Sequence, residues 1–354
     1  MPYMRAGTAP ATHGATGRAL ALARAMPNVE LHLHLEGTLE PEMMLDLARR
    51  NGVRSRFGDA DEVRRALEFH DLQSFLDLYY EETRVLRTRQ DFHDLTAAYL
   101  ARARADGIRH TEVFLDPQSH TSRGVSFGDV VLGVSDALGE ARERDDISSR
   151  LICCFLRHLS EADAYTTLGQ VLEYRDLVDG VGLDSGEVGN PPSRFAHVFA
   201  EARRNGLWAV AHAGEEGPPR YIWQALDLGA RRIDHGVRCL GDDALVARLV
   251  RDRVPLTVCP LSNVRLHVVP DLAHHPVRQM LDRGLVLTLS SDDPAYFGGY
   301  LGTVLERTIR TFELTEAEVA QIAANAIEAA VLDEDRRATL QAELATVRAA
   351  ISTT

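Results

Sequence analysis

The stretch VELHLHLEGT, residues 29–38, joins an apolar strand pattern to two histidines and a glutamate. Side chains alternate along a strand, so His32 and His34 are expected to point to the same side. Seven further short apolar runs follow along the chain, and longer helical patterns separate them. Together these runs predict strands at 29–33, 111–115, 151–155, 181–183, 208–211, 232–233, 256–258 and 286–289. Strands that alternate with helices in this way indicate parallel βα units.

Eight βα units are the number that closes a (β/α)8 TIM barrel, an α/β fold of about 250 residues. The chain has 354 residues. The surplus predicts a helical insert after the first strand, at about 40–106, and extra C-terminal helices after Gly298. Residues 1–26 are rich in Ala, Gly, Thr and Arg, and we expect a flexible tail that leads into a short helix. Residues 27–354 are then predicted to form a single barrel domain.

The composition is that of an ordinary globular protein, with 45% hydrophobic residues, 26% charged residues and a net charge of −13. An acidic chain argues against nucleic-acid binding, which needs a basic face. No apolar run approaches the roughly 20 residues that a membrane helix needs. The four cysteines show no CxxC spacing. We therefore expect buried thiols and a reducing, cytoplasmic location.

The chain contains no lysine, and all 39 basic residues are arginine. A phosphate-binding P-loop, a Schiff base and a pyridoxal-phosphate anchor each require a lysine. A carbamylated lysine that bridges two metal ions is excluded for the same reason. Any catalytic mechanism for this chain must therefore work without a lysine.

Imidazoles and carboxylates follow four of the predicted strands. In a barrel of this kind the active site lies at the carboxyl ends of the strands, so these groups are expected to meet in one mouth. Zinc takes neutral imidazole nitrogens and carboxylate oxygens, and a catalytic zinc lowers the pKa of a bound water to about 7. Iron, manganese or another divalent transition metal would accept similar ligands. The candidate ligands are His32, His34, His212 and Asp292.

Each motif has an ordinary interpretation when it is taken alone. A single HxH on a strand is weak evidence for a metal, and Asp293 before Pro294 could cap a helix. His235 alone could be a hydrogen-bonded core histidine. The segment His34-Leu35-Glu36 matches half of the cytidine-deaminase signature, but no cysteine supplies the PCxxC half. The joint occurrence of the motifs, in order at strand ends, favours a catalytic metal site.

The ordered motifs resemble those of the adenosine and adenine deaminase family of metallo-dependent hydrolases, and the resemblance spans residues 28 to about 330. A single motif of this set would be unspecific, whereas the combination is highly specific. The motifs are HLHLEGT (32–38), SGEVGN (185–190), HAGEEG (212–217), RIDHG (232–236), CPLSN (259–263) and SSDDPAYF (290–297).

The resemblance implies a (β/α)8 barrel with one zinc ion, held by the four candidate ligands named above. Zinc-bound hydroxide then attacks C6 of a 6-aminopurine. Glu215 matches the acid that protonates the purine at N1, and His235 matches the residue that orients and activates the water. Asp293 matches the carboxylate that hydrogen-bonds N7. Gly186 matches a position whose backbone N–H meets the purine.

Within the family, the sequence is more similar to the adenine deaminase branch. Adenosine deaminases usually carry Asp where this chain has Glu36, and the longer side chain could leave less room for ribose. Segments 116–120, 186–192 and 293–300 also resemble that branch. The resemblance therefore implies deamination of adenine to hypoxanthine and ammonia, in purine salvage. The alternatives are adenosine, N6-substituted adenines and aminofutalosine-type nucleosides.

Two other classes of protein stay open at this point, a non-catalytic purine- or metal-binding protein and a metal-dependent amide or ester hydrolase. The partner implied by the resemblance is a small-molecule purine, and the sequence leaves homo-oligomerisation open.

In the predicted insert, Phe75, Leu76, Tyr79 and Tyr80 fit either an apolar lid over the base or ordinary helix packing.

Overall fold

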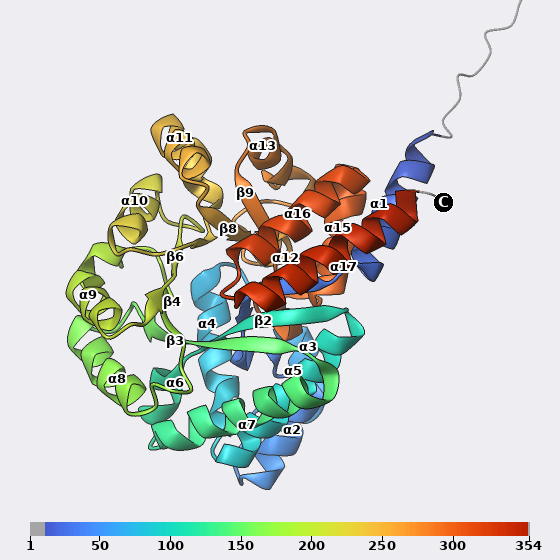
Figure 1. The fold of residues 1–354 in the computed structure, drawn as a ribbon. Coiled ribbons are helices and arrows are strands. Elements are labelled where there is room, and N and C mark those ends of the chain that lie inside the picture. The colour runs from blue at the N-terminus through green and yellow to red at the C-terminus, as the bar shows by residue number, and fades with distance from the viewer. Residues whose placement is uncertain (1–10, 353–354) are drawn as a thin grey trace, which may run out of the picture.

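A ring of parallel strands occupies the centre of the molecule, and helices surround it (Figure 1). The computed structural model describes residues 11–352. The strands of this part of the chain are β1 (Asn28–His34), β2 (Ile108–Leu115), β3 (Ser148–Leu156), β4 (Gly180–Asp184), β5 (Trp208–Ala209), β6 (Ala211–Ala213), β7 (Ile233–His235), β8 (Pro255–Val258) and β9 (Val286–Leu289).

Hydrogen bonds between neighbouring strands close the ring. The strands form two parallel sheets, with orders β1-β2-β3-β4-β5 and β6-β7-β8-β9. The Val210 N–H donates to the Val181 carbonyl at 3.0 Å, which joins the two sheets on one side. On the other side Leu33 pairs with Asp292, and the His34 N–H donates to the Asp292 carbonyl at 3.0 Å. The predicted TIM barrel is confirmed.

The fifth barrel strand differs from its prediction, because the run 208–211 is divided at Val210 into β5 and β6. The first half, Trp208–Ala209, pairs with β4, whereas the second half, Ala211–Ala213, pairs with β7. The two halves of one barrel strand thus bond different neighbours. The second half ends at Ala213, two residues beyond the predicted end of the strand, so His212 lies on the strand itself.

Helices return the chain from each strand to the next and cover the outside of the barrel (Figure 1). Most begin at a side-chain cap, such as Ser126, which accepts a hydrogen bond from the Asp129 N–H at 3.0 Å. The outer helices are α5 (Arg89–Ala105), α7 (Phe127–Asp145), α8 (Glu161–Glu173), α9 (Ala196–Arg204), α10 (Pro219–Asp227), α11 (Asp243–Arg251) and α13 (Val277–Asp282). Three short helices follow strands within a few residues: α6 (Pro117–Thr121), α12 (Pro260–Arg265) and α14 (Pro294–Phe297).

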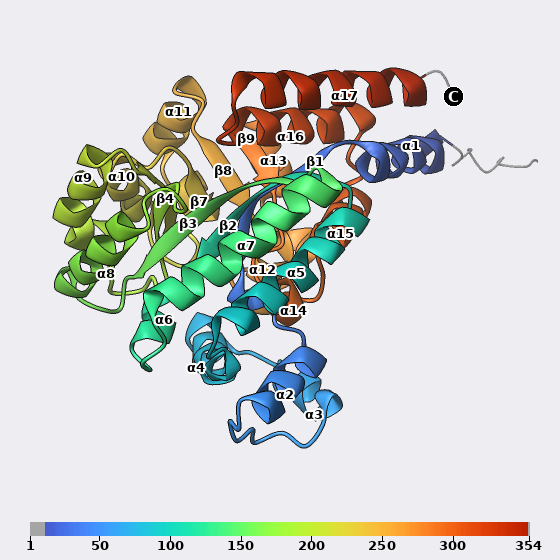
Figure 2. The ribbon, with the colours of Figure 1, turned by 60° about the horizontal axis from the view of Figure 1, so that its bottom comes forward.

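The predicted insert after the first strand is present as three helices, α2 (Pro41–Arg50), α3 (Ala60–Ala66) and α4 (Leu72–Glu82). Helix α4 begins with a capping box, in which Asp71 and Ser74 bond each other's backbone N–H groups. Its apolar side chains form a cluster separate from the main core, together with Tyr296 and Phe297 of α14. The insert lies on the opposite side of the barrel from the C-terminal helices (Figure 2).

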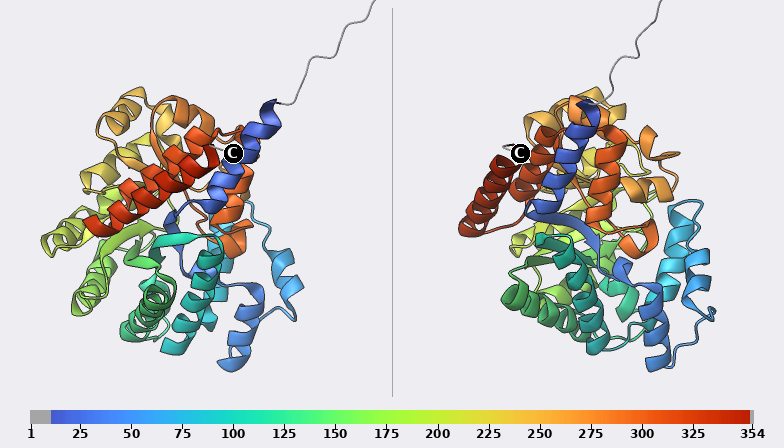
Figure 3. Two further views of the ribbon diagram at one scale, coloured as in Figure 1. Left: turned by 45° about the vertical axis from the view of Figure 1, so that its right-hand side comes forward. Right: turned by 90° about the vertical axis from the view of Figure 1, so that its right-hand side faces the viewer.

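The predicted C-terminal helices are α15 (Leu301–Phe312), α16 (Glu316–Ala329) and α17 (Glu334–Ser352), and α16 packs against β1 and β9. Helix α1 (Ala11–Ala25) lies beside them (Figure 3). The short helix expected in the N-terminal segment is present as α1, whereas residues 1–10 lie outside the described part and the flexible tail over 1–26 stays a prediction. Ala19 and Leu22 are fully buried, and spaced apolar side chains pack this helix onto α15 and α16. That residues 27–354 form one domain stays a prediction.

Two expectations from composition concern the thiols and membrane spans. All four cysteines are buried and unpaired, as predicted. Among residues 11–352, no helix combines the length and apolar character that crossing a bilayer requires.

Candidate active site

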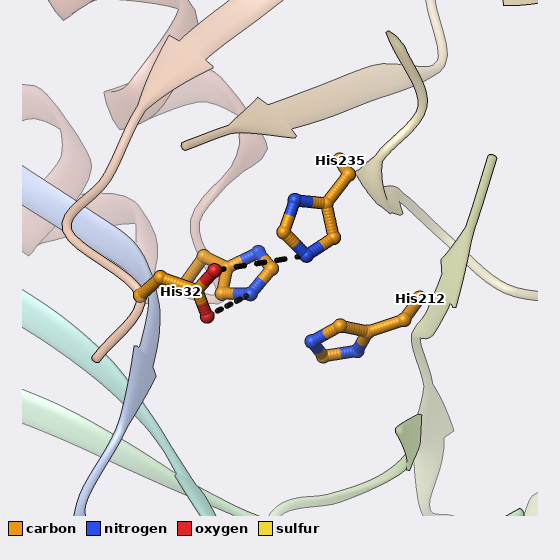
Figure 4. A group of neighbouring side chains, drawn as sticks. His32, His212 and His235 are labelled. Carbon is orange, nitrogen blue, oxygen red and sulfur yellow. Dashed lines mark ion pairs between the residues drawn. The ribbon is translucent and has the colours of Figure 1, made fainter. Parts of the chain in front are cut away.

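The predicted site residues converge at the carboxyl ends of the barrel strands. His32 and His34 lie on β1, His212 on β6 and His235 on β7, and Asp292 follows β9. The imidazoles of His32, His212 and His235 point toward one another (Figure 4). Their ring centroids are 4.6 Å apart from His32 to each of the other two. Residues from four separate strand ends thus meet in one mouth.

The donor atoms of this group fit a divalent cation. His32 Nε2 is buried, has no hydrogen-bond partner and lies 3.1 Å from Asp292 Oδ1. His34 Nε2 lies 3.1 Å from His212 Nε2 and 3.5 Å from Asp292 Oδ1. Burial lowers the pKa of both His34 and His212, which favours the neutral imidazole that binds metal. Gathered imidazole nitrogens and a carboxylate, with an orphaned buried nitrogen among them, are what a bound cation would satisfy.

The geometry brings a fifth residue into this cluster. One ligand atom from each of His32, His212, His235 and Asp292 lies within 4.8 Å of all the others. His34 belongs to two neighbouring groups, one with Asp116 and Asp184 and one with Asp292 and Asp293. His34 still contacts both His212 and Asp292, so it borders the same space. The four-ligand set from the sequence therefore stays a proposal, and His235 lies next to it.

A buried polar network holds His32 on the side away from the mouth. His32 Nδ1 lies 2.9 Å from Thr257 Oγ1, and the Thr257 hydroxyl donates to Asp234 Oδ1 at 2.8 Å. Arg232 donates to Asp234 at 3.2 Å and also to Glu112, and all of these side chains are 0–1% exposed. A hydrogen bond on the far ring nitrogen fixes the tautomer and leaves Nε2 free toward the mouth. The network thereby orients His32 for a ligand.

Two residues of the mouth, His235 and Asp292, adopt a left-handed backbone, with φ of 66° and 68°. Side chains other than glycine rarely occupy this region, and such strain is common at functional sites. Burial alone would raise the pKa of Asp292, but His32 and His235 hold it well below its ordinary value. Asp292 is therefore an anion that faces imidazoles, as a metal ligand requires.

Glu215 lies in the loop after β6 and is 4% exposed. Burial, followed by the negative charges of Asp292 and Glu187, raises the pKa of Glu215 well above its ordinary value. Glu215 Oε2 lies 3.5 Å from His235 Nε2. Burial, together with the neighbouring His32, lowers the pKa of His235 to about 3. The pair thus combines a carboxyl group that keeps its proton with a neutral imidazole, which suits acid–base chemistry.

Asp293 and Gly186 occupy different positions relative to the cavity. Asp293 lines the cavity, and its Oδ1 is buried without a hydrogen-bond partner. A Cβ on Gly37 would lie 2.1 Å from that oxygen, so only glycine leaves room for the Asp293 carboxyl group. Gly186 lines an outer groove, whereas its neighbour Ser185 lines both the groove and the cavity. Contact between Gly186 and a purine stays a prediction.

A small cavity lies above the histidines, and α4 forms one of its walls. Apolar side chains and a few polar groups line it together, as is usual for small-molecule sites. Phe75, Leu76, Tyr79 and Tyr80 line it and also pack in or against the cluster of α4 and α14. Both interpretations from the sequence therefore apply, because these side chains cover the site and pack the helix. The Tyr80 hydroxyl donates to Ser185 Oγ at 3.0 Å, which fastens α4 to the loop after β4.

Glu36 does not belong to the described residues that line the cavity. Its Oε1 accepts a hydrogen bond from the Asp116 N–H at 3.1 Å and lies 2.8 Å from His120 Nε2. Glu36 thus holds the start of α6, and the side chain that reaches the cavity there is Asp116. The structure gives Glu36 an indirect place beside the site, rather than one in the cavity wall.

Sequence reasoning missed Asn263, which contacts the acid–base pair, and His275, which contacts Asn263. Asn263 Nδ2 lies 3.5 Å from both Glu215 Oε1 and His235 Nδ1. His275 Nε2 lies 3.0 Å from Asn263 Oδ1, and His275 is 3% exposed. The motif CPLSN was visible in the sequence, yet nothing in it identified Asn263 as a neighbour of Glu215. His275 carried no sequence signal at all.

A (β/α)8 barrel with a buried group of imidazoles and carboxylates at its strand ends defines a metal-dependent hydrolase. The sequence pattern of the adenosine deaminases matches residues 27–347. The chain therefore belongs to the adenosine deaminase family, whose members are metal-dependent amidohydrolases that act on C–N bonds.

Three named proteins are similar to this chain over most of its length. The adenine deaminase of Cupriavidus taiwanensis is 56% identical over 322 residues, which cover 91% of this chain and 92% of that protein. The crystal structure of the adenine deaminase of Arthrobacter aurescens is 51% identical with a TM-score of 0.90, over 91% of this chain and 99% of that one. An amidohydrolase of Burkholderia ambifaria with bound Zn is 28% identical with a TM-score of 0.86, over 99% and 97% of the two chains.

Proposed function

We propose that this chain hydrolyses adenine to hypoxanthine and ammonia. The observation that carries the proposal is the buried pair Glu215 and His235, which lies beside the histidines that could hold a cation and lines the same small cavity. The relatives named above, adenine deaminases at 51–56% identity over 91% of this chain, support adenine as the substrate. Such a reaction would serve purine salvage.

We also propose that a single zinc ion is the resident cofactor, held by His32, His34, His212 and Asp292. When bound, zinc lowers the pKa of a coordinated water to about 7, so that hydroxide is available at neutral pH. The soft-to-intermediate imidazole donors and one carboxylate support zinc over the hard cations magnesium and calcium. The bound Zn of the Burkholderia ambifaria protein supports the same choice.

Glu215 and His235 divide the proton transfers of the proposed reaction. Aromatic C6 is a poor electrophile, so Glu215 donates its proton to N1 and makes C6 more reactive. His235 orients the attacking water and accepts one of its protons. A new C–O bond forms at C6, and the exocyclic C–N bond breaks as the amino group takes up the proton held by His235 and departs as ammonia. The second proton of the water, left on the new C6 oxygen, returns to Glu215. One water is consumed for each hypoxanthine and ammonia formed.

The remaining groups hold the base. Asp293 is proposed to bond N7 through the carboxyl oxygen that has no partner in the protein. The Gly186 backbone N–H is proposed to contact the purine from the groove side. Phe75 and Leu76 cover the faces of the ring with apolar surface. We further propose that residues 27–354 form one domain. We also propose a cytoplasmic location, which the unpaired cysteines support. A measurement of the molecular mass in solution would show whether the protein forms a homo-oligomer.

The test is a direct comparison of substrates on zinc-loaded protein. Adenine, adenosine and N6-methyladenine are offered at matched concentrations, and ammonia and the oxopurine are followed by chromatography. Conversion of adenine with adenosine left intact is the expected result. A preference for adenosine or for the N6-substituted base would contradict adenine as the substrate but would leave the proposed active site unchanged. Metal binding without turnover of any purine would overturn the proposal and favour an amide hydrolase.

A further inference from the structure

The Glu187 side chain lies in a cradle made by the backbone of the loop 214–217. Glu187 follows β4, the loop follows β6, and the Glu187 side chain is 1% exposed. Its Oε1 accepts a hydrogen bond from the Gly214 N–H at 2.6 Å. Its Oε2 accepts hydrogen bonds from the N–H groups of Glu215 at 3.1 Å, Glu216 at 2.9 Å and Gly217 at 2.7 Å. One carboxylate thus satisfies four successive backbone donors.

The cradle depends on a close approach between the two loops. A Cβ on Gly217 would lie 2.5 Å from Glu187 Oε1, so any other residue would push the carboxylate out. Gly214 has φ of 71°, and a Cβ there would lie 2.5 Å from the Ile222 side chain. Successive N–H groups that turn toward one point form a site for an anion. Here a side chain of the same protein occupies that site.

Arg157 joins the same two loops from the other side. Its Nη1 donates to the His212 carbonyl at 2.7 Å, and its Nε donates to the Asn190 carbonyl at 2.8 Å. Arg157 is fully buried, and the charge of Glu187 acts on it favourably. The backbone is therefore held on both sides of Glu215, at the carbonyl of 212 and at the amides of 214–217.

We propose that Glu187 is a positioning residue for Glu215, which fixes the backbone of that residue so that its carboxyl group faces the substrate. This inference rests on the proposed function, because it assigns a partner to the proposed proton donor. A group that transfers a proton must lie within hydrogen-bond reach of its target. A shift of about 1 Å in such a group can cost up to about 100-fold in rate. The hydrogen bonds that Glu187 makes to this loop all go to backbone N–H groups, and its charge, after burial and the charge of Asp292, helps to raise the pKa of Glu215.

The test is a double-mutant cycle with Glu187→Gln and Glu215→Gln, assayed on adenine with zinc content and melting temperature recorded. Glutamine keeps one acceptor and presents an N–H2 group to the remaining backbone donors, so part of the cradle is lost. We expect Glu187→Gln to lower kcat by about 10- to 100-fold and to change KM by less than about 3-fold. In the Glu215→Gln background the same substitution should have almost no further effect, because Glu187 acts through Glu215. Full additivity of the two losses would overturn the proposal.

A matched control comes from Glu161, a glutamate that also accepts backbone N–H bonds. Its Oε1 accepts from His197 at 2.8 Å and Val198 at 3.1 Å, outside the cavity lining. Glu161→Gln makes the same chemical change and should leave kcat unaltered. Gly217→Ala is the second variant, since it displaces Glu187 from the opposite side. It should reproduce the loss in kcat, whereas wild-type kcat in this variant would contradict the cradle.

Amide hydrogen exchange gives a readout that does not depend on the substrate. The amides of 214–217 should exchange more slowly in the wild type than in Glu187→Gln, while the rest of the barrel keeps its protection. Unchanged exchange at these four positions would overturn the proposal even if adenine is deaminated. If the wild type releases no ammonia from adenine, the proposed function fails, and faster exchange in the variant still supports the cradle.

Discussion

The floor and the cover of the cavity are built on different physical principles. The floor consists of strand ends with imidazole and carboxylate side chains, and a buried hydrogen-bond network holds His32 through Thr257 and Asp234. The cover is α4, whose inward face is apolar and aromatic and packs in its own cluster with α14. Phe75 and Phe297, for example, have ring centroids 4.7 Å apart.

This difference suggests a division of roles, in which the floor carries the chemistry and the cover controls how the substrate binds. Polar groups on strands are held by neighbours on both sides, so their geometry is fixed to fractions of an ångström, as proton transfer and metal binding need. Apolar contacts are non-directional, so most of the contacts of the covering helix constrain its position less sharply than hydrogen bonds do, apart from the bonds of Tyr80 and Glu82. Substitutions in the floor should therefore affect turnover, and substitutions in the cover should affect substrate binding and stability.

Removal of the metal from the floor is expected to have the largest effect. Treatment with a chelator should lower the rate of ammonia release by about 1,000-fold or more, because several kcal/mol of charge stabilisation are lost. The melting temperature should fall as well, since a ligand that binds only the folded state stabilises it. Zinc added back should restore both quantities. Full turnover by protein that has been shown to contain no metal would contradict the proposed metal site in the floor of the cavity.

Glu215→Gln should lower kcat by about 100- to 10,000-fold, the usual contribution of an acid–base group, with zinc content unchanged. The wild-type rate should fall as pH rises, because the reaction needs protonated Glu215 and its raised pKa places that loss above its ordinary range. The variant carries no such group, so its alkaline decline should be absent. If the alkaline decline in rate persists in Glu215→Gln, the titration of another residue must cause it.

In the cover, Leu76→Ala should act mainly on binding. Leu76 is 6% exposed and lines the cavity, and its apolar contact with the base is worth about 1.5 kcal/mol, which corresponds to about a tenfold rise in KM. The loss of kcat should be much smaller than that of the floor variants. The free energy of unfolding should fall by about 2–5 kcal/mol, as for other large-to-small changes in a core. A selective loss of kcat would show that α4 takes part in the chemistry.

Glu82→Gln should leave turnover nearly unaltered and change only the pH dependence of stability. Glu82 is 5% exposed, accepts a hydrogen bond from the Tyr296 hydroxyl at 2.8 Å, and burial raises its pKa to about 7. The folded protein keeps this proton between pH 4.5 and 7, whereas the unfolded chain releases it, so folding stability falls as pH rises through this window. The variant should be more stable than the wild type at pH 8, by at most about 3 kcal/mol, and similar at pH 5. Thermal melts at both pH values would measure this, and equal differences at the two would contradict the shift.

The floor could be predicted from the sequence much more completely than the cover. His32, His34, His212 and Asp292 lie at strand ends, and parallel strands in a barrel bring their carboxyl ends together whatever the details of packing. The cover depends on how an inserted helix packs, and the same aromatic side chains of α4 fit a lid or ordinary packing equally well. The extent of the helix at 11–25 could not be predicted for a similar reason, because its spaced small apolar residues gain stability only against α15 and α16.

The sequence by itself determined the barrel, its insert and terminal helices, and the set of side chains that meet in the mouth, because local periodicity and strand-end position are sufficient for these. Only the tertiary structure decided which atoms face one another. It placed His235 against Glu215, turned Glu36 away from the cavity toward His120, and brought Glu187 into the backbone cradle of 214–217. Contacts between residues distant along the chain depend on the path of every element between them, and no local pattern encodes that path.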